Sequence, residues 1–271
     1  MSLSILALVV VYGTVPSQSP AITSLGAIEK RGVSLRTLVW DNSPNPLKCE
    51  LTDGNWGKTS WVHTPENRGL SAIYNEVIAR WLQPSEYLLL LDQDTLLPAN
   101  FFESAVAAMT RNPTVELFLP MVRAHERWVS PLDAAVGWGR YWKTPRIGLL
   151  PSRHVGAINS GMIIAASYLQ STFVGYDRDL QFYGTDTYFM LEFRRQNRWV
   201  WILDAVIDHD LSFFSTSTTE KVTKFRAMRR ANMICYRRSA WPVRWTVRTV
   251  MTGVAFVYSL RYRDLGFLRP H

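Results

Sequence analysis

The sequence is poor in cysteine and lacks any long apolar run. Its 271 residues include only two cysteines, Cys49 and Cys235, which lie far apart and match no metal-binding spacing. This argues against a disulfide scaffold and fits a reducing compartment. No segment approaches the roughly 20 apolar residues that a membrane-spanning helix needs. Residues 3–11 are apolar like the core of a signal peptide, but no basic residue precedes them, so we expect a buried first strand there.

Acidic residues are scarce in the C-terminal part of the chain. Residues 220–271 hold 12 of the 30 lysines and arginines but only two of the 22 acidic residues, whereas the remainder is nearly neutral. Such a basic segment favours an anionic partner, either phospholipid headgroups or nucleic acid. We therefore expect an α/β domain over residues 1–215 and a basic, Trp-rich helical tail over residues 216–271.

Strand and helix patterns alternate in the first hundred residues. We expect strands at residues 6–11, 34–40, 61–63 and 87–91, and helices at residues 22–30 and 70–82. This alternation predicts a mostly parallel, Rossmann-like central sheet flanked by helices. Ligands of such sheets bind at the carboxyl ends of the strands, where Asp41 and Asp92 both fall.

The second half of the chain is less regular. We expect a helix at residues 100–111, a strand at 117–120, a loop region over 124–154 and a strand at 157–165 that Ser160-Gly161 interrupts. A helix at 183–197, a strand at 199–203 and a mostly helical tail beyond residue 212 follow. No internal repeat is present.

The most informative motif is Asp92-Gln93-Asp94, which directly follows the apolar stretch 87–91. Two carboxylates so close together at the end of a buried strand repel each other without a counter-charge. A hard divalent cation resolves this, because Mg²⁺ commonly binds one or two carboxylates plus substrate phosphates. A nucleotide diphosphate supplies such phosphates, and the cation neutralises the departing diphosphate. The alternative interpretation is an ordinary polar turn.

Several short motifs accompany this turn in a fixed order over roughly residues 5–215. They are Trp40-Asp41-Asn42-Ser43, the stretch from Glu66-Asn67-Arg68-Gly69 to Asn75, Leu91-Asp92-Gln93-Asp94-Thr95 with Pro98, Asn159-Ser160-Gly161, Tyr183-Gly184-Thr185-Asp186 with Arg194, and Asp208-His209-Asp210-Leu211. The ordered set resembles the family-2 glycosyltransferases with the GT-A fold, especially their bacterial rhamnosyltransferase-like branch. The resemblance implies transfer of a sugar from a nucleotide-sugar donor.

The resemblance also implies a donor site and a metal site. In the donor site, Ser160 and Gly161 line the sugar pocket, and Asp92 contacts the ribose or, through water, the metal. Asp94 is the main ligand of a divalent Mg²⁺ or Mn²⁺, with His209 as a third ligand or simply a histidine at a strand end.

Two further donor contacts each keep an alternative. Asp41 accepts a hydrogen bond from a pyrimidine N–H or forms an Asx-turn, and Arg68 binds a phosphate or the base or is a surface arginine.

An inverting displacement needs a base near the acceptor hydroxyl, and Asp186 is the candidate. Thr185 stands where the family usually has another carboxylate. The alternative role for Asp186 is a helix cap or ion pair, and Asp177 and Asp179 are rival bases in what looks like a surface turn. An aromatic group is either an acceptor platform or part of a core; its members are Trp138, Tyr141 and Trp142.

Five arginines of the tail recur at helical spacing and share one face of a helix if the tail is continuous: Arg226, Arg230, Arg237, Arg244 and Arg248. With the tryptophans among them they favour an in-plane helix at an anionic membrane surface, where a saccharide or polyprenyl-linked acceptor sits. The alternative is a solvated helix packed on the body. We accordingly expect a cytoplasmic enzyme, peripheral on the inner face of the cell membrane, that acts in cell-surface polysaccharide synthesis.

Two rival classes remain. A nucleic-acid-binding protein would use the basic tail, but no helix-turn-helix, zinc or single-strand-binding signature is present, so we expect no nucleic-acid partner. A sugar nucleotidyltransferase would also use paired aspartates and a metal. It normally has a Gly-rich basic loop after its first strand, whereas residues 12–20 hold one glycine and no lysine or arginine.

Overall fold

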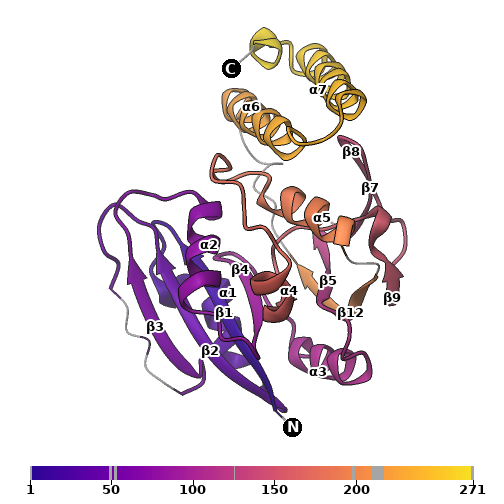
Figure 1. Cartoon of the computed structure of the whole chain (residues 1–271). Helices are drawn as coiled ribbons and strands as arrows, with labels where there is room; N and C mark the ends of the chain where they lie inside the picture. Colours follow the sequence, from indigo (N-terminus) through magenta and orange to yellow (C-terminus); the bar gives the residue numbers. More distant parts are fainter. Residues whose placement is uncertain are drawn as a thin grey trace.

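A large mixed sheet forms the centre of the protein (Figure 1). The computed structural model describes residues 2–48, 51, 54–124, 126–196, 199–208 and 217–269. Within them the strands follow the order β3 (Lys58–His63), β2 (Val33–Asp41), β1 (Leu3–Val11), β4 (Tyr87–Asp92), β11 (Met162–Ala165), β5 (Leu117–Ala124), β12 (Trp199–Asp208) and β9 (Gly148–Pro151), with β6 (Arg127–Ser130) paired to β5. Only β11, β9 and β6 run against the others, so the expectation of a mostly parallel sheet is confirmed.

Helices cover both faces of the sheet. Because successive side chains of a strand point to opposite faces, β1 contributes Leu6 and Leu8 to one core and Ile5, Ala7 and Val9 to the other. The first core also takes residues from α2 (Leu70–Arg80), α4 (Ala166–Ser171) and α5 (Thr185–Gln196), and the second from α1 (Pro20–Ala27) and α3 (Phe101–Arg111). The apolar stretch at the start of the chain is therefore the buried strand that its pattern predicts.

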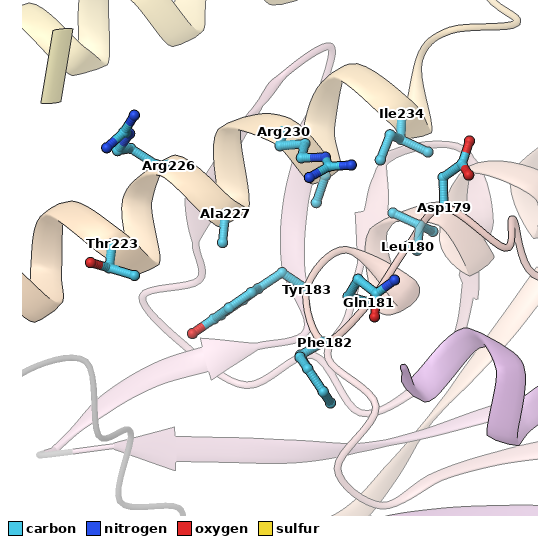
Figure 2. Close-up of a pocket in the computed structure, with 11 residues that line it drawn as sticks. Asp179, Leu180, Gln181, Phe182, Tyr183, Thr223, Arg226, Ala227, Arg230 and Ile234 are labelled. Carbon is cyan, nitrogen blue, oxygen red and sulfur yellow. The ribbon is translucent and has the colours of Figure 1, made fainter. Parts of the chain in front are cut away.

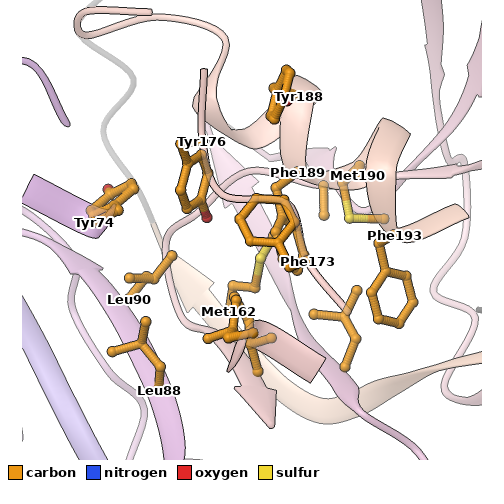
Figure 3. Packing of buried hydrophobic residues seen from close by; sticks show 14 of the residues in the cluster. Tyr74, Leu88, Leu90, Met162, Phe173, Tyr176, Tyr188, Phe189, Met190 and Phe193 are labelled. Atoms are coloured by element: carbon orange, nitrogen blue, oxygen red, sulfur yellow. The ribbon is translucent and has the colours of Figure 1, made fainter. Parts of the chain in front are cut away.

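An aromatic cluster fills the core beneath α4 and α5 (Figure 3). The ring of Tyr168 lies 5.0 Å from Phe193, and Phe173 lies 5.0 Å from Tyr176, centroid to centroid. Tyr74 of α2 joins them through Tyr176, at 5.3 Å. Tilted and edge-on ring pairs of this kind add stability beyond their buried area. The cluster fixes α5 and the segment before it against the sheet.

The expectation of a loop over residues 124–154 is wrong. Besides β6 and β9, this region forms β7 (Leu132–Ala135) and β8 (Trp138–Tyr141), which with β10 (Val155–Gly156) make a small antiparallel sheet. These strands are short and largely exposed, so the sequence carries no buried apolar run to announce them. The expected strand over 157–165 is also shorter, because residues 157–161 form an irregular segment that ends in a turn.

The tail is helical, as expected, but it is not one continuous helix. α6 (Thr218–Cys235) and α7 (Trp241–Tyr262) lie side by side, followed by the short 3-10 helix η3 (Leu265–Leu268) (Figure 1). Arg237 lies in the connection, so the tail arginines do not share one helical face. Buried residues of the tail belong to the first of the two cores described above. They are Ala231, Cys235, Tyr236 and Val247. No helix in the described ranges is long and apolar enough to span a membrane.

Candidate active site

The carboxyl ends of β1, β2 and β4 meet at one edge of the sheet. Val11 pairs with Asp41 and Val10 with Asp92 across the central strands. A cavity of about 320 Å³ opens beside these ends, and its polar and aromatic lining includes Tyr12, Asn42, Asn67, Asp92, Gln93 and Phe182. This is where open α/β sheets bind their ligands.

Asp41 is fully buried and holds the loop that follows β2. Its carboxylate accepts hydrogen bonds from the backbone N–H groups of Ser43, at 3.0 Å, and Leu47, at 2.8 Å. The geometry is that of an Asx-turn, one of the two interpretations of this residue. The neighbouring Asn42 lines the cavity instead.

Asn42 joins β2 to the loop before α2. Its Oδ1 accepts from the Arg68 N–H at 2.8 Å, and its Nδ2 donates to the Arg68 carbonyl at 2.8 Å. The Arg68 guanidinium pairs with Glu76 at 2.8 Å and lies over the Trp40 ring. Arg68 is therefore held on the rim of the site by its own chain, with 30% of its side chain exposed.

The acidic turn is anchored by its middle residue. Gln93 Oε1 accepts from the Tyr12 N–H at 2.8 Å, and the Gln93 carbonyl accepts from the Ser19 hydroxyl at 2.7 Å. Both bonds tie the loop after β1 to the end of β4. Asp94 is exposed, whereas Asp92 is partly buried and accepts a hydrogen bond from Ser160 Oγ. Ser160, which is predicted to line the sugar pocket, thus forms a hydrogen bond directly with the acidic turn.

Gly161 occupies a position that other residues do not fit. Its φ is +81°, and a Cβ there would lie 2.4 Å from Ile207 Cδ1 and 2.8 Å from Pro120 Cγ. Its N–H donates to the Leu90 carbonyl at 2.8 Å. The glycine therefore allows the turn to close against β4 and brings Ser160 to Asp92.

Asp186 lies in the first turn of α5, at the amino end predicted for the base. Burial raises the pKa of its carboxyl, and the nearby charge of Asp92 raises it further, while the hydrogen bond from the Thr187 N–H, at 2.6 Å, opposes this. The structure therefore brings the predicted base close to the acidic turn. A carboxylate with a raised pKa accepts a proton more readily at neutral pH.

Tyr74, Tyr176 and Asn159, which the sequence analysis did not assign to the site, surround these carboxylates. Burial raises the pKa of Tyr74 above its usual range, the charges of Asp92, Tyr176 and Asp186 add to this, and a hydrogen bond from Asn159 opposes it. Tyr176 Oη and Asn159 Oδ1 are buried without a hydrogen-bond partner among the described residues. Neither oxygen reaches the solvent, so the interior beside the carboxylates holds two unsatisfied polar groups.

The segment before α5 is fixed from two sides. The Asn75 side chain accepts from the Tyr176 N–H at 2.8 Å and donates to its carbonyl at 2.9 Å. Arg237 from the tail pairs with Asp177 at 2.6 Å and with Asp179 at 2.5 Å. The rival bases Asp177 and Asp179 are therefore ion-pair partners that hold this segment.

The three aromatic residues expected to bind the acceptor divide into two groups. Trp142 is buried, with its Nε1–H donating to Asp133 at 2.9 Å and Arg146 over its ring, so it belongs to the core. Trp138 and Tyr141 are exposed on β8, with exposed fractions of 57% and 55%. None of the three lines the cavity at the strand ends.

The predicted metal ligand His209 lies outside the described residues. Among the residues that are described, no three His, Cys, Asp or Glu side chains gather as a metal-binding group. Asp92 and Asp94 still suit a hard divalent cation, because that ion completes its coordination with substrate phosphates and water. A bound cation would also offset the negative charge of Asp92, which raises the pKa of Asp186.

The fold and the acidic turn resemble those of glycosyltransferases of the GT-A type. Residues 40–173 match the model of glycosyl transferase family 2. This match covers just under half of the chain, and with the fold and the ordered motifs it supports a family-2 glycosyltransferase. No curated protein matches the chain.

Solved structures agree with the fold. The chain resembles S. aureus TarS with a TM-score of 0.56 and 14% identity, over 99% of this chain and 54% of that one. It resembles GalNAc-T7, crystallised with UDP, GalNAc and Mn²⁺, with a TM-score of 0.59 and 10% identity, over 85% and 47%. A match to TarS 1–349 with UDP-GlcNAc has a TM-score of 0.53 and 10% identity, over 97% and 84%. The chain spans about half to two thirds of the first solved chains that it matches.

Proposed function

We propose that the chain is a metal-dependent, inverting glycosyltransferase that moves a sugar from a nucleoside-diphosphate sugar to an acceptor hydroxyl. The observation that carries this proposal is the position of Asp92 at the carboxyl end of β4 in the lining of the cavity, near enough for its charge to raise the pKa of Asp186. A transferase of this kind needs a cation-binding carboxylate at the leaving group and a second carboxylate as the base. The acidic turn and the start of α5 supply these two parts.

The cavity between the loops after β1 and β2 is the proposed donor site. Asn42 and Asn67 offer polar side chains on one side of it and Asp92 lies on the other. UDP is the first nucleotide to test, because TarS and GalNAc-T7 were crystallised with it. The rhamnosyltransferase-like motifs make a rhamnosyl donor the first sugar to test. Arg68 contributes to phosphate or base binding if it exchanges Glu76 for the nucleotide.

A divalent Mg²⁺ or Mn²⁺ would be held by Asp94, by Asp92 directly or through water, and by His209. The ion supplies neutralising charge at the diphosphate when it is bound. Ser160 orients Asp92 by its hydrogen bond, and Gln93 keeps the turn in place through its two bonds to the loop after β1.

Asp186 accepts the proton of the acceptor hydroxyl as that hydroxyl attacks the anomeric carbon. Its raised pKa makes the carboxylate a stronger base than an exposed aspartate. The first turn of α5 keeps the carboxylate in place, since the Thr187 N–H donates to it.

The proposed acceptor is a saccharide or a polyprenyl-linked saccharide of cell-surface polysaccharide synthesis, reached at the inner face of the cell membrane. The exposed apolar residues of α7 support a peripheral membrane location, because Trp241, Trp245, Phe256 and Leu260 recur at helical spacing on one side of the helix. Trp138 and Tyr141 are exposed and available as an acceptor platform.

Calorimetric titration with nucleoside diphosphates, with Mn²⁺ or Mg²⁺ and with EDTA, tests the proposal. We expect metal-dependent binding of one nucleotide by the native chain and its loss in Asp94→Ala. Asp204→Ala is the matched control, because Asp204 is an exposed aspartate that lines a different cavity.

Loss of nucleotide binding in both variants, or in neither, would contradict the assignment of Asp94. Failure of the native chain to bind any nucleotide with either metal would sink the proposed function. Release of pyrophosphate from a nucleoside triphosphate would instead identify a nucleotidyltransferase.

A further inference from the structure

Five arginines line a groove between α6 and α7. The groove has a volume of about 430 Å³, and the arginines are Arg229, Arg230, Arg237, Arg244 and Arg248. Trp241 and Trp245 also line it, and no carboxylate is among its described lining residues. The chain thus gathers positive charge from two helices into one concave surface, beside two exposed indole rings.

Most of this charge has no ion-pair partner among the residues that the structure describes. Arg237 pairs with Asp177 and Asp179, whereas the other four arginines form no ion pair with any residue that the structure describes. Like charges held close together repel one another, and a bound anion offsets that repulsion. The planar guanidinium matches phosphate oxygens with two parallel hydrogen bonds, so a phosphate or pyrophosphate is the anion that such a cluster fits best.

A second cavity lies between the groove and the proposed donor site. This middle cavity, of about 420 Å³, lies between α6 and the segment from Asp179 to Tyr183 (Figure 2). Arg230 lines both the groove and the middle cavity. Phe182 lines both the middle cavity and the cavity at the strand ends. The three cavities therefore follow one another from the groove, past Arg230 and Phe182, to the cavity that Asp92 lines.

The apolar surface beside the groove favours a phosphate that is attached to a lipid. The exposed apolar side of α7 continues from Trp241 and Trp245 to Phe256 and Leu260. Tryptophan and arginine together are typical of helices that lie at a lipid surface. A phosphate presented at the groove by a lipid would have its apolar chain beside these residues.

We propose that the groove between α6 and α7 binds the pyrophosphate of a lipid-linked saccharide acceptor and directs its sugar through the middle cavity to Asp186. The inference rests on the proposed glycosyltransferase function and adds a binding site for the pyrophosphate of its lipid-linked acceptor. Arg229, Arg230, Arg244 and Arg248 bind the pyrophosphate, while Arg237 holds the segment that leads to Asp186.

Titration with farnesyl diphosphate in EDTA tests the groove, because EDTA silences the metal-dependent nucleotide site. We expect the double substitution Arg244→Ala/Arg248→Ala to weaken binding by about tenfold or more. The control Arg261→Ala/Arg269→Ala removes the same charge from exposed positions outside the groove, and we expect a change within about twofold. Equal weakening in both double variants would show a bulk charge effect and overturn the proposal.

The source of the phosphate is tested with vesicles. Phosphatidylcholine vesicles carry either a polyprenyl diphosphate or enough phosphatidylglycerol to give the same total charge. We expect tighter binding to the polyprenyl diphosphate vesicles, and loss of that preference in Arg244→Ala/Arg248→Ala. Equal binding to both vesicles would make the groove a general headgroup surface. Inorganic pyrophosphate that binds as tightly as farnesyl diphosphate would remove the lipid from the proposal.

Metal-dependent nucleotide binding, measured on the same variants, separates the two proposals. We expect it to be unchanged in both double variants. If the native chain binds no nucleotide, the proposed function fails while the diphosphate titration still reports on the groove. If nucleotide binds normally and farnesyl diphosphate does not bind, the acceptor inference fails alone.

Discussion

Asp186 combines a raised pKa with a position in the first turn of a helix. Since its folded-state pKa lies above its unfolded value, the ionised carboxylate lowers stability at neutral pH, and that penalty disappears as the pH falls through the folded pKa. The environment of Asp186 therefore favours a proton acceptor over a structural cap, because a cap is stabilised by its charge.

We expect Asp186→Asn to lower transfer by about 10²- to 10⁴-fold while nucleotide binding stays near the native value. The free energy of unfolding at pH 7 should not fall, because the amide oxygen keeps the bond from Thr187 and the buried charge is gone. Steady-state kinetics, calorimetry and urea denaturation measure the three quantities. The acid limb of the native pH–rate profile should lie above the usual aspartate range, and a fully active variant would exclude Asp186 as the base.

The sequence predicted the first hundred residues well because their strands are continuous apolar runs buried on both faces. The order of the motifs also predicts that the acidic turn and Asp186 share a site, and the effect of Asp92 on the pKa of Asp186 is consistent with this. The sequence did not reveal Tyr74, Tyr176 or Asn159, because their roles depend on contacts between segments far apart in the chain. Nor did the sequence decide between the two roles considered for Asp41 and for Trp142. An aspartate can form an Asx-turn as readily as it binds a base, and a tryptophan can lie in the core as readily as it binds a sugar.

At the scale of elements, the turn before β11 determines how the acidic turn is held. Ser160-Gly161 lies in a turn before β11 and not in the strand, because the chain approaches β4 closely there. The short strands β7 and β8 escaped prediction because β8 is an exposed edge strand and β7 is only half-buried, so neither carries a periodic apolar pattern.

Gly161→Ala should lower the free energy of unfolding by about 2–4 kcal/mol, because its positive φ and its contacts with Ile207 and Pro120 leave no room for a methyl group. Gly253→Ala is the control, since Gly253 lies in α7 with no atom near its missing Cβ. That change should raise stability by about 0.5–1 kcal/mol. Chemical denaturation measures both, and equal stability of the two variants would contradict the close packing at Gly161.

At the scale of the whole molecule, the tail has two distinct sides. The buried side packs into the first core, where Ala231 and Cys235 lie against Gly184 just before α5. The outer side of α7 remains exposed and apolar. The tail therefore packs on the body through one side, and the membrane interpretation stays a prediction for the other.

Phe256→Ser/Leu260→Ser should reduce partitioning of the protein onto anionic vesicles by roughly tenfold, because both apolar side chains are more than half exposed. Binding of farnesyl diphosphate in solution should not change, as neither residue lines the arginine groove. Ile147→Ser/Val174→Ser, which alters two exposed apolar residues on the body, is the control for vesicle sedimentation. Unchanged partitioning of the α7 variant would show that this face does not meet the membrane.

Phe182 is a wall shared by the cavity at the strand ends and the middle cavity. For protein engineering, this means that donor and acceptor preferences are linked at that position. A library that varies residue 182 to admit a new donor sugar also reshapes the passage from the groove, so a selection for one property screens for both. Independent tuning has to begin at residues that line a single cavity, such as Asn67 for the donor and Ala227 for the acceptor.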